Sequence, residues 1–292
     1  MTSDDMSSGV GGGLRRMLHD ALWRTAVDLG VRLSGDVVYG WRDRSIGSAV
    51  ERGREVLWLR IVWARAEWAR GAWWTGNRDA GGIRIDTKPT LLESREHTEG
   101  EVVFRAELMT LAPGSPCAST PELRDHVDID GEWWSGLERS LITIAATPTP
   151  RMSLDPISVR RRIAVFFGYE IDTDPARWVS CHGDLHWNNI HADPLAIVDW
   201  EAWGLAPRGY DAAFLLGHSL GVPAIASEVT RRFRDDLDSD DGVIAQLYVL
   251  TKMLTRADGG AHPELIAPIH RHADRLLGRA PVSRPLTLGV NP

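Results

Sequence analysis

The chain has 292 residues, of which 43% are hydrophobic and 25% charged, as in an ordinary globular protein. Its formal net charge of −7 argues against a nucleic-acid or membrane-surface binder, because such proteins present a basic face. Two cysteines, Cys117 and Cys181, do not make a disulfide framework, and no run of about twenty apolar residues would span a membrane. With no apolar signal-peptide region near the N-terminus, the cytoplasm is the expected location.

The first third of the chain predicts one helix followed by strands. Residues 1–13 are rich in Ser, Asp and Gly and are expected to be disordered. From Leu14 the apolar residues recur at helical spacing, which predicts a short helix that ends near Gly30. Strands are predicted next over residues 36–41, 48–51 and 55–62. Residues 63–80 are rich in Ala, Arg, Glu and Trp and predict a helix.

The composition changes after the next predicted strand, residues 101–111, which leads into Ala112-Pro113-Gly114-Ser115-Pro116. Helices are predicted beyond it, over residues 133–145, 157–167, 211–220, 224–237, 241–255 and 263–277. The tail from Pro281 is expected to be loose. The sequence therefore predicts an α+β chain with a small β-rich lobe, residues 14–112, and a larger, mainly helical lobe, residues 113–280.

The stretch from Cys181 to Glu201 reads CHGDLHWNNIHADPLAIVDWE. Asn189 follows Asp184 by five residues, and a short apolar run ends in Asp199. This pattern predicts a catalytic loop followed by a strand that delivers a carboxylate. Kinases place a loop Asp beside the attacking hydroxyl, and an Asn and a second Asp on Mg²⁺, at such spacings. Because Mg²⁺ prefers oxygen ligands and keeps several waters, two side chains suffice to hold it.

HGDLHWNNI followed by IVDWE resembles the aminoglycoside phosphotransferase-like family, the small-molecule branch of the kinase fold. The resemblance implies a bilobal protein-kinase-like fold. It also implies roles for five residues: Asp184 as catalytic base, Asn189 and Asp199 as Mg²⁺ ligands, His182 as a structural loop residue, and Asp211 as a brace for the loop.

The first lobe departs from the kinase pattern. In a kinase-like lobe a hairpin tip covers the nucleotide phosphates, and here Ser45, Gly47 and Ser48 take that place without a Gly-x-Gly-x-x-Gly motif. A plain exposed hairpin is the alternative. The strand position of the phosphate-binding Lys carries Arg60, which keeps the positive charge and can bind phosphate through two hydrogen bonds. A surface salt bridge is the alternative for Arg60.

Two further features of the first lobe are expected from the resemblance. The helix after the strand normally gives an acidic partner to the strand cation, and Glu67 and Asp79 are weak candidates for it. Adenine would bond the backbone of the hinge between the lobes, at Met109, Thr110 and Leu111. A simple linker between domains is the alternative interpretation of the hinge.

The predicted activity moves the γ-phosphoryl group of ATP or GTP to a hydroxyl group of a small molecule, with Mg²⁺ as cofactor. An aminoglycoside, another antibiotic, a choline-like alcohol, a sugar and a peptide hydroxyl all fit, so antibiotic resistance is one open role. The acidic run over residues 235–241 is interpreted as a solvated loop, with a contact to a cationic substrate as the alternative. The oligomeric state is not predicted.

Two other classes of function stay open. A catalytically degenerate kinase-fold protein that binds a partner in a biosynthetic pathway is favoured by the missing strand Lys and opposed by the intact loop. A 2-His-1-carboxylate iron oxygenase is suggested by the spacing of His182 and Asp184. The completing ligand would be one of His186, His191, His218 and His270. This second alternative leaves Asn189 without a role.

Overall fold

The computed structural model describes residues 4–171, 174–258, 260, 262–279 and 283–285. The chain divides into two compact units, residues 1–82 with 88–112 and residues 83–87 with 113–292. The main division follows Ala112, whereas the short segment 83–87, expected in the first lobe, packs with the second unit. None of the described helices combines the length and apolar character that a membrane span requires.

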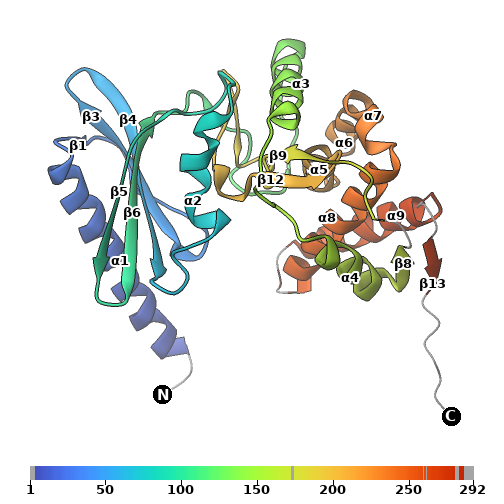
Figure 1. Ribbon diagram of the computed structural model, residues 1–292, viewed down its shortest axis with the longest axis horizontal. Coiled ribbons are helices and arrows are strands. Elements are labelled where there is room, and N and C mark those ends of the chain that lie inside the picture. Colours follow the sequence, from blue (N-terminus) through green and yellow to red (C-terminus); the bar gives the residue numbers. More distant parts are fainter. Residues whose placement is uncertain (1–3, 172–173, 259, 261, 280–282, 286–292) are drawn as a thin grey trace. The chain divides into compact units, whose positions relative to one another are not determined.

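The first unit is built on a six-stranded antiparallel sheet (Figure 1). Its strands are β1 (Arg32–Leu33), β2 (Val38–Tyr39), β3 (Ser45–Arg52), β4 (Glu55–Arg65), β5 (Leu91–Glu99) and β6 (Val102–Thr110). Their order in the sheet is β1-β3-β4-β6-β5, and β2 also pairs with β3. β5 therefore lies at an edge, and β4 lies between β3 and β6.

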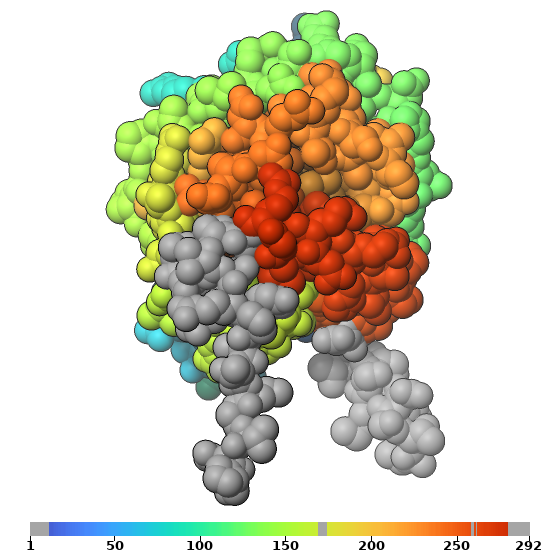
Figure 2. Space-filling model, turned by 90° about the vertical axis from the view of Figure 1, so that its right-hand side faces the viewer, coloured from blue at the N-terminus to red at the C-terminus, as the bar shows by residue number. Residues whose placement is uncertain are grey.

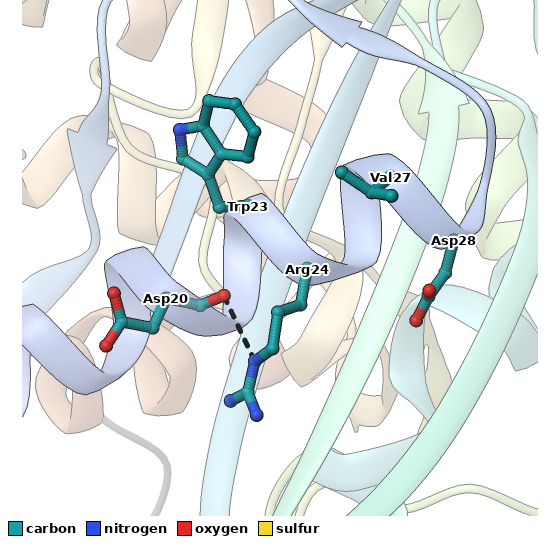
Figure 3. Close-up of a pocket in the computed structure, with 5 residues that line it drawn as sticks. All are labelled: Asp20, Trp23, Arg24, Val27 and Asp28. Atoms are coloured by element: carbon teal, nitrogen blue, oxygen red, sulfur yellow. Dashed lines mark hydrogen bonds between the residues drawn. The ribbon is translucent and has the colours of Figure 1, made fainter.

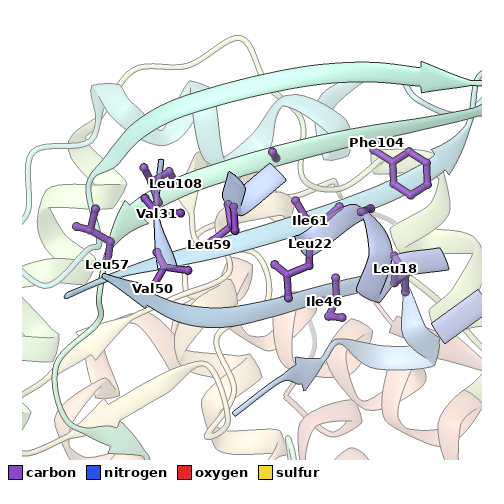
Figure 4. Packing of buried hydrophobic residues seen from close by; sticks show 13 residues of the cluster. Leu18, Leu22, Val31, Ile46, Val50, Leu57, Leu59, Ile61, Phe104 and Leu108 are labelled. Carbon is purple, nitrogen blue, oxygen red and sulfur yellow. The ribbon is translucent and has the colours of Figure 1, made fainter. Parts of the chain in front are cut away.

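One face of this sheet packs on helix α1 (Asp4–Asp28), as Figure 4 shows. Successive side chains of a strand point to opposite faces. Leu59 and Ile61 of β4 therefore share one face, where they join Leu18 and Leu22 of α1 in a cluster that is fully buried. The helix begins at Asp4 rather than near Leu14, and residues 1–3 of the predicted disordered tail lie outside the described residues.

The outer side of α1 exposes two large apolar side chains among charged ones. Trp23 and Val27 are 57% and 64% exposed and line a shallow hollow together with Asp20, Arg24 and Asp28 (Figure 3). Arg24 Nε donates to the backbone oxygen of Asp20 at 3.3 Å. No residue of the predicted site lines this hollow.

The prediction of a helix over residues 63–80 was wrong in its first half. Strand β4 continues to Arg65, and helix α2 (Ala72–Asp79) begins only after Gly71. Ala64 keeps the strand alternation and is buried against Trp74 of α2. Gly71 adopts a φ of 80°, a conformation that other residues rarely take, and its flexibility lets the chain turn into the helix.

The second unit is mainly helical. Its helices are α3 (Gly131–Ala146), α4 (Pro156–Phe167), α5 (Tyr210–Gly217), α6 (Pro223–Arg232), α7 (Arg234–Leu237), α8 (Asp240–Asp258) and α9 (Ile266–Leu277). Helix α8 is central, because it packs against α4, α5, α7 and α9. Figure 2 shows α9, in red, on one face of this unit beside the orange α6 and α7. The side chain of Asp130 caps the start of α3, because it accepts from Trp133 N at 2.8 Å.

Short strands support the segment from Cys181 to Glu201. β10 (Ile190–Ala192) lies between β11 (Ala196–Ile197) and β7 (Ser115–Pro116), β9 (Trp178–Cys181) pairs with β12 (Gly204–Pro207), and β8 (Tyr169–Ile171) pairs with β13 (Ser283–Pro285). Part of the tail predicted to be loose thus forms a strand, while residues 286–292 lie outside the described residues.

Candidate active site in the second unit

The loop that carries Asp184 is held at its start by Asp211 of α5. The Asp211 carboxylate accepts the backbone N–H of His182 at 2.7 Å and that of Gly183 at 3.0 Å. This is the bracing contact that the family resemblance implies. Gly183 has a φ of 86°, and a Cβ there would lie 2.3 Å from the backbone oxygen of Ala202, so only glycine fits. Burial raises the pKa of Asp211 to about 6, although the two N–H groups oppose it.

His182 ties the same loop to the strand that precedes Asp199. Its ring is fully buried, and Nε2 lies 3.0 Å from the backbone oxygen of Val198. Burial lowers the pKa of His182 to about 4. The ring is therefore neutral at pH 7, and it donates from Nε2 because a carbonyl oxygen only accepts. The edge of the ring also packs against Trp200, with centroids 4.7 Å apart.

The hairpin of β10 and β11 brings the backbone of Asn189 against Val198, the residue before Asp199. Val198 N donates to the backbone oxygen of Asn189 at 3.0 Å, so the residue before Asp199 lies opposite Asn189. The side-chain nitrogen of Asn189 donates to the backbone oxygen of Asp184, also at 3.0 Å. Asp199 has a left-handed backbone with a φ of 65°, a conformation that is uncommon outside glycine and gathers at functional sites.

The donor atoms of this hairpin fit Mg²⁺. Because the amide nitrogen of Asn189 is used by Asp184, the amide oxygen is the atom left for a cation. Together with the carboxylate of Asp199 it gives two hard oxygen ligands, which suit Mg²⁺. No group of three or more His, Cys, Asp and Glu side chains could hold a metal ion within the described part of the chain. In the iron-oxygenase alternative His182 would be a ligand, whereas its Nε2 atom contacts the backbone oxygen of Val198.

Asp184 lies in a partly buried position beside a histidine. Its Oδ2 atom is 3.6 Å from Nε2 of His186. Burial raises the pKa of Asp184, but the neighbouring groups His186, Lys252 and Arg256 outweigh burial and hold the pKa below its ordinary value. Burial also lowers the pKa of His186 below its ordinary value. A carboxylate with a lowered pKa is ionised at neutral pH and can accept a hydrogen bond.

Lys252 and Arg256 of α8 were missed by the sequence reasoning. Lys252 Nζ lies 3.2 Å from the Tyr210 hydroxyl oxygen and 4.8 Å from the centre of the Phe214 ring. Burial lowers the pKa of Lys252, whereas Asp184 raises it. The only signal in the sequence was the spacing of four residues, which places both cations on one face of a helix. Nothing in that spacing indicates that the face lies near Asp184.

The predicted phosphate-binding residues of the first unit lie on neighbouring strands. Gly47 of β3 pairs with Arg60 of β4, which pairs with Glu107 of β6. Arg60 NH1 is 3.4 Å from the Oε2 atom of Glu107, whose side chain is fully buried. Glu107 also accepts from Arg105 Nε at 2.8 Å and from Asn77 of α2 at 2.7 Å. Glu107 is thus an acidic partner of Arg60 that the sequence reasoning did not indicate.

The two serines of the predicted phosphate-binding tip are buried in the sheet. Ser48 is fully buried, and its hydroxyl donates to the backbone oxygen of Gly35 at 2.9 Å. That hydroxyl therefore serves the packing of the sheet instead of a phosphate. Ser45 is 8% exposed at the first position of β3. Gly47 is required locally, because a Cβ there would lie 2.6 Å from the Trp58 ring.

The predicted hinge residues lie at the end of β6. Thr110 N donates to the backbone oxygen of Thr90 at 2.9 Å, and the Thr110 hydroxyl oxygen accepts from Thr90 N at the same distance. The Thr110 amide is thus already used within the first unit. Adenine contacts at Met109 and Leu111 stay predictions.

Comparison with known proteins agrees with this geometry. The model of the phosphotransferase enzyme family matches residues 128–248, which include the whole loop from Cys181 to Glu201 and also Asp211. Comparison with curated protein sequences gave no match.

Solved structures show the fold. The crystal structure of aminoglycoside phosphotransferase APH(4)-Ia has a TM-score of 0.56 at 12% identity, covering 87% of this chain and 98% of that one. A thermostable mutant of that enzyme, in ternary complex with ADP and hygromycin B, has a TM-score of 0.55 at 12% identity, covering 87% and 97%. The chain therefore has the α+β, protein-kinase-like fold of these structures, and its residues 128–248 are similar to the phosphotransferase enzyme family.

Proposed function

We propose that this protein transfers the γ-phosphoryl group of ATP to a hydroxyl group of a small molecule. The observation that carries the proposal is the connected loop in which Asn189 bonds Asp184 through its side chain and the residue before Asp199 through its backbone. The presence of ADP and hygromycin B in a solved structure of similar fold supports a nucleotide and a small-molecule acceptor. The cytoplasm remains the expected location.

In the proposed mechanism, Asp184 accepts a hydrogen bond from the acceptor hydroxyl and so aims its oxygen at the γ-phosphorus. The new oxygen–phosphorus bond forms as the bond to the β-phosphate oxygen breaks, and ADP leaves. Asp184 takes the hydroxyl proton, but a carboxylate with a lowered pKa is a weak base. Its main contribution is therefore positioning, as in other phosphoryl-transfer enzymes.

Asn189 and Asp199 would hold Mg²⁺ through their side-chain oxygens. When bound, Mg²⁺ supplies neutralisation of the negative charge on the phosphates. Arg60 would steady the phosphates that are not transferred, and the backbone at Ser45 and Gly47 would approach them. Met109 and Leu111 are the proposed contacts of the base, which leaves GTP as an alternative donor.

The test is transfer of the γ-phosphoryl group from labelled ATP or GTP to a panel of alcohols, with mass spectrometry of the products. The panel contains aminoglycosides, choline, neutral sugars and hydroxy acids, so that it spans positive, neutral and negative acceptors. The proposal predicts an acceptor-dependent phosphorylated product that is lost in Asp184→Asn. A chain that binds neither nucleotide at millimolar concentration and yields no product contradicts it.

A kinase-fold binding protein without activity is the second candidate. It is favoured by the arginine at the position of the strand lysine, because the larger Arg60 side chain is paired with Glu107. A thermal-shift measurement with ATP and Mg²⁺ separates the two candidates. A stabilised parent chain favours the enzyme, and an unchanged unfolding temperature favours the binding protein.

A further inference from the structure

The face of α8 near Asp184 carries two cations that the proposed mechanism does not use. Lys252 and Arg256 are one helical turn apart and partly buried. Within the described residues, neither has a carboxylate partner within 4.0 Å; Lys252 contacts the Tyr210 hydroxyl and the Phe214 ring instead. A partly desolvated ammonium group is costly unless a negative charge accompanies it.

The ammonium group of Lys252 lies near the proposed catalytic carboxylate of Asp184. His186 connects Asp184 with Lys252. Its Nε2 atom lies 3.6 Å from Asp184 Oδ2, and its ring lies near the ring of Phe214. The ammonium group of Lys252 lies over that same Phe214 ring. Lys252 and Asp184 therefore border one small group of side chains in the second unit.

Arg162 adds a third positive charge next to α8. Arg162 of α4 donates to the Thr251 hydroxyl at 3.2 Å and to the Thr255 hydroxyl at 2.6 Å, and so lies along α8. Its charge, like that of Arg256, lowers the pKa of Lys252. A polycationic acceptor placed at Asp184 would meet this positive field, whereas an acceptor with an anionic group would be attracted to it.

Three acids of the run over residues 235–241, the alternative contact for a cationic acceptor, make contacts with other residues of the second unit. Asp236 pairs with Arg208 at 2.7 Å, and Asp238 pairs with Arg279 at 2.9 Å. Asp241 accepts the backbone N–H groups of Ala176 and Arg177 at 2.7 and 3.1 Å. Three of the acids are thus engaged in structural contacts, and the alternative of a cation-binding run loses its support.

We propose that Lys252 and Arg256 bind an anionic group, a carboxylate or a phosphate, on the acceptor whose hydroxyl faces Asp184. The acceptor is then an acidic alcohol, not a polycationic aminoglycoside. This inference rests on the proposed phosphotransferase function. The γ-phosphate of the nucleotide is the other source of the same chemistry, and the experiment separates the two.

The probe is inorganic phosphate, titrated calorimetrically at constant ionic strength into the full chain saturated with AMP-PNP and Mg²⁺. AMP-PNP fills the triphosphate positions, so phosphate must bind elsewhere. In Lys252→Met, which keeps an unbranched side chain but removes the charge, we expect phosphate affinity to fall about tenfold or more, the scale of one lost charged contact. Arg271→Met removes an exposed charge from α9 and should leave the affinity unchanged.

Each outcome decides between the sources. Equal phosphate affinity in the parent and in Lys252→Met, or no binding to the parent, overturns the anion site. A tenfold loss of AMP-PNP affinity in Lys252→Met shows that the cations serve the nucleotide, which overturns the acceptor assignment. Faster turnover of an aminoglycoside than of every hydroxy acid in the acceptor panel also overturns it.

Two contingencies keep the test decisive. If the parent binds neither AMP-PNP nor the GTP analogue GMP-PNP, the proposed phosphotransferase function fails, and titration of the nucleotide-free chain still measures whether phosphate binding depends on Lys252. If circular dichroism shows that Lys252→Met does not fold, Arg256→Met takes its place, with the same expected loss of phosphate affinity.

Discussion

The side-chain amide of Asn189 donates a hydrogen bond to the backbone oxygen of Asp184 at 3.0 Å. This contact closes the loop that carries the proposed base and leaves the amide oxygen of Asn189 as the atom that would bind a cation. The five-residue spacing that first indicated this pair is the span of the loop that this hydrogen bond closes. The proposed base and the proposed metal ligand Asn189 are therefore joined within one loop, and the backbone of Asn189 also accepts from the residue before Asp199.

Asp184→Asn tests the role of the carboxylate. The substitution keeps the size of the side chain but removes the negative charge that orients the hydroxyl, so we expect phosphoryl transfer to fall by about 100-fold or more. Nucleotide affinity and the unfolding temperature should stay close to those of the parent chain. Steady-state kinetics with coupled ADP detection measures the rate, and turnover near the parent rate would rule out Asp184 as the base.

Glu107→Gln tests the buried ion pair of the first unit. Arg105 is 2% exposed, and the neutral glutamine leaves its guanidinium without a counter-charge. We expect a loss of about 3 kcal/mol of unfolding free energy, as for other broken buried pairs. Glu51→Gln, which breaks an exposed contact to Arg32, is the matched control and should cost less than about 1 kcal/mol. Denaturant unfolding of both variants gives the comparison, and equal costs would contradict the assignment.

Arg60→Lys and Arg60→Met test the proposed phosphate contact. Lysine keeps the charge, so nucleotide affinity should change by no more than about threefold, whereas methionine should weaken it about tenfold. Titration with ATP and Mg²⁺ measures both. An affinity that is unchanged in Arg60→Met would show that Arg60 serves only the ion pair with Glu107.

The pH dependence of stability should report the buried ring of His182. Its pKa is about 4 in the folded chain, below the ordinary value of 6.5. Between these two pH values the ring is protonated in the unfolded chain but neutral in the folded chain, which favours unfolding. The contribution of His182 to the free energy of unfolding is therefore fully present above pH 6.5, and it decreases as the pH falls toward 4. Between pH 7 and pH 4.5 the loss should be about 2 kcal/mol.

His182→Gln should be less stable than the parent at pH 7, yet its stability should fall less steeply between pH 7 and pH 4.5. The exposed His270→Gln is the control and should keep the parent slope. Urea unfolding at the two pH values measures both slopes. Identical slopes in the parent and in His182→Gln would show that the ring is not held neutral by burial.

The loop motif could be read from the sequence because its residues are close together in the chain and tied to fixed spacings. The helices of the second unit were also predictable, since residues such as Asp130 and Gly168 mark where they begin and end. How these helices pack against one another could not be predicted from the sequence.

Other features depend on contacts that no local pattern contains. Strand β5 was not predicted, because an edge strand of mostly exposed polar residues has little apolar alternation and forms through its pairing with β6. Lys252 reaches the neighbourhood of Asp184 only because α8 packs against α5. Glu107 pairs with Arg60 across two strands that are far apart in the chain. Such contacts are tertiary, and spacing alone does not indicate them.

The most direct test of the central claim is calorimetric titration of ATP, with and without Mg²⁺, into the parent chain and into Asp199→Ala. The account predicts that Mg²⁺ strengthens ATP binding to the parent by about tenfold or more, the scale of one charged contact, and that this gain disappears in Asp199→Ala. A Mg²⁺-dependent gain of the same size in both chains would contradict the assignment of Asp199, and with it the proposed nucleotide site.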